Sequence, residues 1–174
     1  MENITGSAGD DTITGDDDKN TLKGLAGDDT LSGQIGNDYL DGGEGSDTAS
    51  YAEKTVSVTV DFTTNEATTT VGADTLVSIE NAIGGSAKDT FIMNEDGVEN
   101  IINGGNEEDT ISYENYSSNG VSVNLSTTLE QSVVANDGDT ILNIENVIGS
   151  SEDDNFIGST LDNSFEGGIG NDTF

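Results

Sequence analysis

A large apolar residue recurs at intervals of nine through the first 40 positions of the chain. Ile4, Ile13, Leu22, Leu31 and Leu40 are separated by stretches rich in Gly, Asp, Ser and Thr. Nine residues are too few for a helix pair or a hairpin, but they suffice for a six-residue turn and a three-residue strand with one inward side chain. Two such units complete one coil. The pattern therefore predicts an all-β parallel solenoid in which residues 18 apart are neighbours on adjacent turns.

A glycine opens each unit, and an acid or amide stands at its sixth position, two residues before the apolar residue at the eighth. The opening glycines are Gly6, Gly15, Gly24, Gly33 and Gly42, and the register returns downstream from Gly84, Gly104, Gly149, Gly158 and Gly167. The sixth positions are Asp11, Asn20, Asp29, Asp38 and Asp47, then Asp89, Asp109, Asp154, Asn163 and Asp172.

This stacking places like charges together. The chain carries 35 Asp and Glu against 4 basic residues, a net charge of −31. Asp11 is expected beside Asp29, and Asp29 beside Asp47, at the strand spacing of about 4.8 Å. Carboxylates at that separation repel by roughly 3.5 kcal/mol at an effective dielectric of about 20, whereas burying one Leu or Ile contributes about 1.5–3 kcal/mol. A divalent cation between the turns reverses the sign, and an oxygen-only shell suits Ca²⁺.

Glycines also occupy the fourth position of several units. We expect the first-position and fourth-position glycines, such as Gly24 and Gly27 or Gly33 and Gly36, to adopt positive φ. That conformation would point consecutive backbone carbonyls at one ion.

Several residue types are missing, and their absence excludes whole classes of function. The sequence has no His, Cys, Trp or Pro. Nucleophilic catalysis by Ser-His or Cys-His systems is thereby excluded, as are zinc, copper, haem and iron–sulfur sites. No apolar run is long enough to span a membrane, and a polyanion of this strength repels nucleic acid. Cations are the natural partners.

Iterated units of the form G-G-x-G-x-D-x-U-x, where U is large and apolar, resemble the RTX (repeats-in-toxin) family of calcium-binding proteins. The resemblance implies a right-handed parallel β-roll that binds several Ca²⁺ ions between its turns. It also implies a protein secreted from Gram-negative bacteria by a type I system, extracellular or on the cell surface.

The resemblance further implies a ligand set. Its carboxylate members would be Asp11, Asp29, Asp38, Asp47, Asp154 and Asp172, joined by Asp89 and Asp109 and by the amides of Asn20 and Asn163. Its backbone carbonyls would come from Gly6, Gly9, Gly24, Gly27, Gly33, Gly36, Gly42, Gly45, Gly167 and Gly170. Ala87, Glu107 and Asp18 replace the fourth-position glycine, so weaker or missing sites are expected at their turns.

Two segments interrupt the nine-residue period and copy one another. Each contains an alternating apolar run, at 56–62 and at 121–125, which predicts a half-buried strand in the same sheets. The Thr-rich 63–70 and the unpatterned 126–138 are expected to be exposed hairpin tips or loops. The predicted organisation is a repeat block at 1–50, an insertion at 51–83, a short irregular block at 84–112, the second insertion at 113–148 and a block at 149–174, all in one continuous solenoid.

Some residues of the insertions have more than one interpretation. Tyr51 and Tyr113 stand where the register demands glycine, and we expect each ring to cover the open end of a roll rather than to stack on a ligand. Glu80 and Glu145, in a repeated Ile-Glu-Asn, would either cap the following block or add a cation ligand.

The sequence predicts a calcium-dependent folding and spacer module, cut from a larger exported polypeptide. We expect no catalytic residues, because the acids occur in repeated copies rather than in one unique constellation. One alternative is an adhesin module that binds glycan or ice directly, although the flat Thr row of ice-binding solenoids is missing at the third positions. Another is the non-catalytic C-terminal module of a secreted hydrolase, alginate epimerase or toxin.

Overall fold

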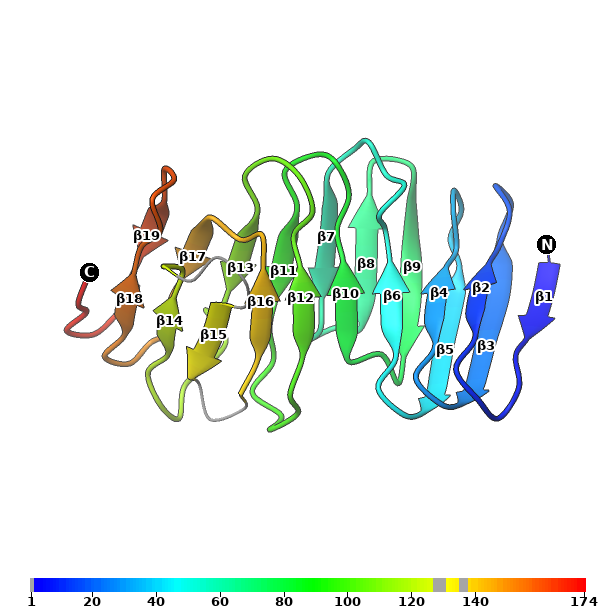
Figure 1. Ribbon diagram of the computed structural model, residues 1–174, viewed down its shortest axis with the longest axis horizontal. Helices are drawn as coiled ribbons and strands as arrows, with labels where there is room; N and C mark the ends of the chain where they lie inside the picture. Colours follow the sequence, from blue (N-terminus) through cyan, green and yellow to red (C-terminus); the bar gives the residue numbers. More distant parts are fainter. Residues whose placement is uncertain (1, 127–130, 135–137) are drawn as a thin grey trace.

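The computed structural model describes residues 2–126, 131–134 and 138–174, and these residues form a two-sheet solenoid without a helix (Figure 1). The chain passes from one sheet to the other at almost every turn, so each sheet is assembled from alternate strands. The fold is therefore an all-β roll of mainly parallel strands, as the nine-residue period predicts. No helix in the described part of the chain is long and apolar enough to cross a membrane.

The first sheet has ten strands. In spatial order they are β1 (Glu2–Thr5), β3 (Asn20–Ala26), β5 (Tyr39–Glu44), β9 (Gly72–Val77), β8 (Glu66–Thr69), β7 (Val58–Asp61), β11 (Thr90–Ile92), β13 (Thr110–Ser112), β17 (Asn146–Ile148) and β19 (Ser164–Glu166).

The second sheet has nine strands. In spatial order they are β18 (Asn155–Ile157), β14 (Ser122–Asn124), β15 (Gln131–Val134), β16 (Thr140–Leu142), β12 (Ile101–Asn103), β10 (Asn81–Ile83), β6 (Thr48–Ser50), β4 (Thr30–Ser32) and β2 (Thr12–Thr14).

The register within the first block confirms the predicted spacing of 18. Ile13 pairs with Leu31 in one sheet, and Leu22 pairs with Leu40 in the other. The short strands have the predicted pattern of one inward side chain, as in β2, where only the central Ile13 is buried. Strands β3 and β5 extend further than three residues because Leu25 and Ala26 continue the pairing into the turn.

The core is a double ladder of apolar side chains, one from most of the strands whose side chains are described. Leu22, Leu31, Leu40 and Ala49 are fully buried, and the ladder continues through Phe91, Ile102, Ile111 and Ile141. Because each strand contributes about one core residue, burying apolar area stabilises each turn by only a few kcal/mol. The stability of a turn therefore depends strongly on whether its buried polar groups find hydrogen-bond or charge partners.

The two insertions form antiparallel hairpins within the sheets. In the first, β8 pairs with both β7 and β9, and in the second, β15 pairs with both β14 and β16. The predicted strands at 56–62 and 121–125 thus extend the sheets as expected. The copies lie in opposite sheets, because the first follows a strand of the nine-stranded sheet and the second follows a strand of the ten-stranded sheet.

The predicted hairpin tips are only partly confirmed. Within 63–70, the turn is exposed, but residues 66–69 form strand β8, and Ala67 on it is buried. Residues 131–134 form a strand where a loop was expected, and the remaining 127–130 and 135–137 of that prediction lie outside the described residues.

The prediction for the two tyrosines is wrong. Tyr51 and Tyr113 are 2% and 0% exposed and lie inside the solenoid, because the hairpins extend the sheets and leave no open end there.

Candidate calcium-binding turns

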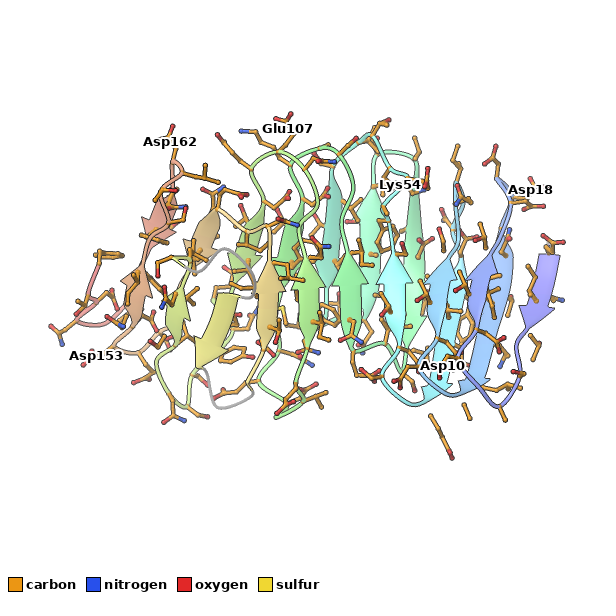
Figure 2. The ribbon with its side chains drawn as sticks, viewed as in Figure 1. Asp10, Asp18, Lys54, Glu107, Asp153 and Asp162 are labelled. Atoms are coloured by element: carbon orange, nitrogen blue, oxygen red, sulfur yellow. The ribbon has the colours of Figure 1, made fainter. Side chains whose placement is uncertain are left out.

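The sixth-position residues stack into two columns, one along each sheet, just before the strands begin. The column of the ten-stranded sheet contains Asn20, Asp38, Asp74, Val58, Asp89, Asp109, Glu145 and Asn163. The column of the nine-stranded sheet contains Asp11, Asp29, Asp47, Glu80, Asn100, Asp139, Val121, Asp154 and Asp172. Figure 2 shows acidic side chains at the turns along both long edges of the molecule, with Asp18 and Glu107 on one edge and Asp10 and Asp153 on the other.

In both columns, an acid accepts a backbone N–H of the neighbouring turn with one of its carboxylate oxygens. The backbone N–H of Asp11 donates to Asp29 Oδ1 at 2.7 Å, and that of Asp29 donates to Asp47 Oδ1 at 2.8 Å. The same bond joins Asn20 to Asp38 at 2.7 Å and Asp154 to Asp172 at 3.0 Å. These contacts confirm that carboxylates of successive turns lie one above another.

The second carboxylate oxygen of several column aspartates has no partner in the protein. The Oδ2 atoms of Asp29, Asp38, Asp47 and Asp109 are buried and have no hydrogen-bond partner. A buried, unpaired oxygen of an ionised carboxylate is costly, so native proteins pair such groups or use them to coordinate metals. A hard divalent cation fits these oxygens because it supplies the missing positive charge.

The first-position glycines keep the space around that oxygen free. A Cβ on Gly24 would collide with Asp29 Oδ2 and would lie 2.6 Å from the carbonyl oxygen of Gly42 on the next turn. A Cβ on Gly6 would similarly meet Asp11 Oδ2 at 2.5 Å and the Gly24 carbonyl oxygen at 2.7 Å. Carboxylate and carbonyl oxygens from two turns therefore converge at Gly6 and Gly24.

The predicted backbone conformation is confirmed at four fourth-position glycines, is wrong at the fourth-position Gly9 and is wrong at the first position. Gly27 and Gly36 have φ of 110° and 148°, but neither Gly24 nor Gly33 lies in the left-handed region. The first position requires glycine because the carboxylate occupies the space of a side chain. Of the remaining predicted glycines, Gly42 and Gly167 adjoin carboxylates, Gly45 and Gly170 have positive φ beside carbonyl oxygens, and Gly9 has no neighbour within 4 Å of its Cβ position.

Burial perturbs the acidity of the column carboxyls. Removal from water raises the pKa of Asp38, Asp47 and Asp89 above the ordinary value. It raises the pKa of Asp74 to about 6 and that of Asp109 to about 7, although backbone N–H donors partly oppose the shift. The folded column without a cation is therefore electrostatically unfavourable for ionised acids.

Not every predicted ligand has an unpartnered oxygen. Asp89 Oδ2 accepts the N–H of Gly85 at 2.6 Å, and Asp154 Oδ2 accepts that of Ser150 at 2.7 Å. Asp11 Oδ2 accepts the N–H of Ser7 at 2.5 Å. In these turns a backbone donor already balances part of the negative charge.

Asparagine at the sixth position makes different contacts. The side-chain amide of Asn20 donates to Asp16 Oδ1 at 2.7 Å and to the carbonyl oxygen of Asp18, while its own Oδ1 accepts the N–H of Asp16. The amide of Asn163 donates to the Glu145 carbonyl oxygen at 3.1 Å. In both residues Oδ1 adjoins the opening glycine, as Oδ2 of an aspartate does, and accepts an N–H of its own turn. The NH₂ donor takes the place of the other aspartate oxygen, which would accept the N–H of the neighbouring turn.

The structure adds four acids to the columns. Two of them were not predicted from the glycine register, and the other two had been assigned two alternative roles. Asp74 and Asp139 occupy sixth positions, each followed by Thr and an apolar residue as in the repeats, and that triplet was a usable signal. Glu80 and Glu145 also stand at sixth positions, and they accept the N–H groups of Asp47 and Asp109 at 2.9 and 3.0 Å.

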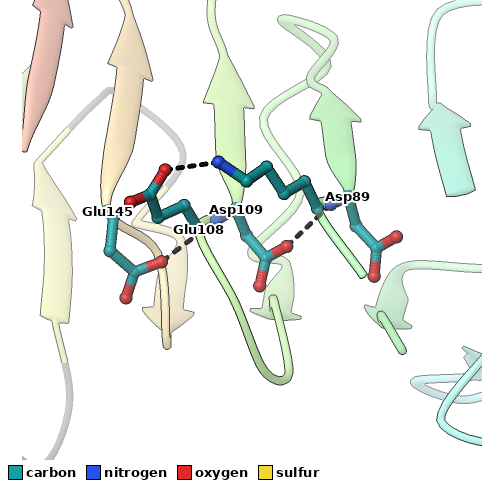
Figure 3. A network of polar contacts seen from close by, with 5 residues as sticks. Asp89, Glu108, Asp109 and Glu145 are labelled. Carbon is teal, nitrogen blue, oxygen red and sulfur yellow. Dashed lines mark hydrogen bonds and ion pairs between the residues drawn. The ribbon is translucent and has the colours of Figure 1, made fainter. Parts of the chain in front are cut away.

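Figure 3 shows one stretch of the column, in which Asp89, Asp109 and Glu145 are linked in series. The N–H of Asp89 donates to Asp109 Oδ1 at 2.7 Å. Beside this column, Lys88 Nζ lies 2.6 Å from Glu108 Oε2 in an ion pair. Both side chains are exposed, so the pair contributes little to stability. The only positive charge in this view is therefore directed at Glu108 and not at the column carboxylates.

No group of three or more acidic side chains within the described ranges is arranged to hold a metal by itself. A turn such as that of Gly24 offers one column carboxylate together with a backbone carbonyl of the next turn. Such a donor set still suits Ca²⁺, which accepts backbone carbonyls readily and tolerates flexible geometry.

Comparison with known protein families matches the RTX calcium-binding nonapeptide repeat, in four copies, to residues 2–22, 14–49 and 148–174. No curated protein matches the chain. The matched segments are the first and last repeat blocks, which contain opening glycines and stacked sixth-position acids in the register of the solenoid. The first and last blocks of the chain thus carry RTX calcium-binding nonapeptide repeats.

Proposed function

We propose that this β-roll folds by binding Ca²⁺ between its turns, with the column carboxylates as the side-chain ligands. The observation that carries the proposal is the set of buried, unpartnered Oδ2 atoms on Asp29, Asp38, Asp47 and Asp109. We assign further ligand roles to Asp11, Asp89, Asp154 and Asp172, with carbonyls supplied by the adjoining glycines. The turns of Asn20 and Asn163, whose amides are already hydrogen-bonded, would bind calcium weakly or not at all.

The proposed role is to couple folding to export. RTX repeats occur in secreted bacterial proteins, and they are calcium-binding rather than catalytic modules. In a calcium-poor cytosol the repelling columns would keep the chain unfolded and able to pass through a type I channel. Millimolar Ca²⁺ outside the cell would then drive folding by mass action at weak, extracellular-type sites.

Once loaded, the five segments from 1–50 to 149–174 would act as one spacer within a larger polypeptide. The support for this is the uninterrupted pairing of strands along both sheets, including the hairpins of the insertions. Any enzymatic activity would then belong to another part of that polypeptide.

Circular dichroism across a calcium titration tests the proposal. The protein in chelator should show a coil-like spectrum, and strand signal should appear cooperatively at sub-millimolar to millimolar Ca²⁺. Mg²⁺ at the same concentrations serves as the control cation, because it prefers octahedral sites and sheds its waters reluctantly. Equal strand content in chelator and in calcium would refute the proposal.

A second candidate function is direct adhesion through an outer sheet face. Thr12, Thr30 and Thr48 stack in register along the nine-stranded sheet and continue into Asn81. Such a row offers evenly spaced hydroxyls to a glycan or to ice. Specific retention of the calcium-loaded protein on a glycan array or on ice would support adhesion, and replacing Thr30 with Val should then abolish it without lowering stability.

A further inference from the structure

Two buried tyrosines make the same contact in the two insertions. Tyr51 Oη donates to Asp74 Oδ2 at 3.2 Å, and Tyr113 Oη donates to Asp139 Oδ2 at 3.4 Å. The tyrosines and their aspartates are all at most 5% exposed. Because the two pairs come from a duplicated segment and lie in opposite sheets, the contact recurs in two separate settings.

Each pair stands where the repeat register breaks. The tyrosine occupies the first position of a unit, where the other units have glycine, and its aspartate occupies the sixth position on the strand that closes the hairpin. Asp74 Oδ1 accepts the N–H of Asp38 at 2.9 Å, and Asp139 Oδ1 accepts that of Asn100 at 3.1 Å. These aspartates therefore hold the neighbouring turn in the same way as the aspartates of the repeats.

The difference lies in the other carboxylate oxygen. In the repeats, Oδ2 of Asp38 is buried without a partner, whereas Oδ2 of its column neighbour Asp74 accepts a phenol O–H. The turn before Asp74 also lacks the opening glycine, since Thr69 stands five residues earlier. The phenol thus occupies the place at which a cation would approach Asp74 Oδ2.

We propose that Tyr51–Asp74 and Tyr113–Asp139 are cation-free clasps, in which a phenol hydroxyl replaces calcium at the hairpin junctions of the roll. The inference rests on the proposed function, because it concerns which column positions require the ion. The clasps let each hairpin close its column without an ion. They divide the solenoid into calcium-dependent repeat blocks joined by junctions with a lower calcium requirement.

Counting bound calcium in matched variants tests the assignment. Asp38→Asn and Asp74→Asn change adjacent members of one column, and both keep an Oδ1 atom that can accept the neighbouring N–H. By native mass spectrometry in calcium, Asp38→Asn should lose one ion relative to the wild type, and Asp74→Asn should lose none. Loss of an ion in Asp74→Asn overturns the clasp but leaves the proposed function intact. A wild-type chain that binds no calcium overturns both.

Hydrogen exchange of the full chain during a calcium titration tests the phenol itself. Tyr51→Phe should raise the calcium midpoint for protection of residues 58–77 by about twofold or more, because it leaves Asp74 Oδ2 buried and unpaired. Tyr113→Phe should act in the same way on the second insertion. Tyr39→Phe is the control, since Tyr39 lies on the outer face of β5 beneath Lys23. Equal midpoints for Tyr51→Phe and Tyr39→Phe would overturn the clasp.

Discussion

Replacing Asp29 with Asn should change stability in opposite directions with and without calcium. Asp29 lies between Asp11 and Asp47 in its column, and its Oδ2 is buried and unpartnered. Asn keeps the oxygen that accepts the Asp11 N–H and removes only the charge. Asn20 shows that the column can hold an amide, in an orientation in which its Oδ1 accepts the N–H of Asp16 and its NH₂ group donates to the carbonyl oxygen of Asp18.

The expected magnitudes follow from the spacing of the turns. Without calcium, each neighbouring carboxylate at about 4.8 Å costs roughly 3.5 kcal/mol at an effective dielectric of about 20, so the substitution relieves up to that amount per neighbour. With calcium, a lost site removes about 2.7 kcal/mol when the free ion stands at about 100 times its dissociation constant. Asp29→Asn should therefore stabilise the metal-free roll and destabilise the loaded one.

Two unfolding experiments measure the two signs. Urea melts in saturating calcium report the loss, and osmolyte-driven folding in chelator reports the gain. Asn20→Asp is the reciprocal control, which should make the metal-free roll harder to fold. A change of the same sign in both conditions would refute the view that repulsion within the columns is what calcium relieves.

The remaining predictions concern packing and pH. Gly24→Ala should lower the thermal midpoint in calcium, at a cost of about 1–3 kcal/mol, because its Cβ would enter the space of the carboxylate of the same turn; Gly9→Ala, with nothing near its Cβ position, should change it little. Leu31→Ala should cost about 2–5 kcal/mol in a urea melt in calcium, since Leu31 is fully buried in the ladder. Burial raises the pKa of Asp74 to about 6 and of Asp109 to about 7 in the folded chain, above the ordinary 3.8. In chelator the folded state should therefore gain stability as pH falls from about 7 to about 4 and lose it as pH rises through the folded pKa values. In calcium the protons compete with the ion at Asp109, so the calcium midpoint in circular dichroism should rise over the same fall in pH.

The repeat blocks could be predicted in detail because one apolar side chain per nine residues leaves little freedom. A slip of one residue would turn Leu22 or Leu31 outward, so the eighth-position pattern determines the register. Once the register is known, the stacking of Asp11, Asp29 and Asp47 follows from geometry alone.

The insertions were harder to interpret because their contacts do not follow the period. Asp74 stands four repeat lengths after Asp38, but it reaches the column through an antiparallel hairpin that the nine-residue count does not reveal. The inward position of Tyr51 was not predicted, because a ring in place of glycine was expected to cover an open end. An open end exists only where the sheets are interrupted. The hairpins continue both sheets, and the ring is enclosed.

The conformation of the opening glycines also depended on a contact that is invisible in sequence. Gly24 was expected to have positive φ, but its role is to leave room for the carboxylate of Asp29. A glycine required for close approach and one required for backbone conformation look identical until the neighbouring side chain is placed.

The most direct measurement is a crystal structure of the calcium-loaded protein with anomalous scattering from the metal. The account predicts anomalous peaks between adjacent turns, within about 2.3–2.6 Å of the Oδ2 atoms of Asp29, Asp38 and Asp47. Well-ordered turns in which those oxygens contact only water or protein donors, with no metal peak beside them, would contradict it.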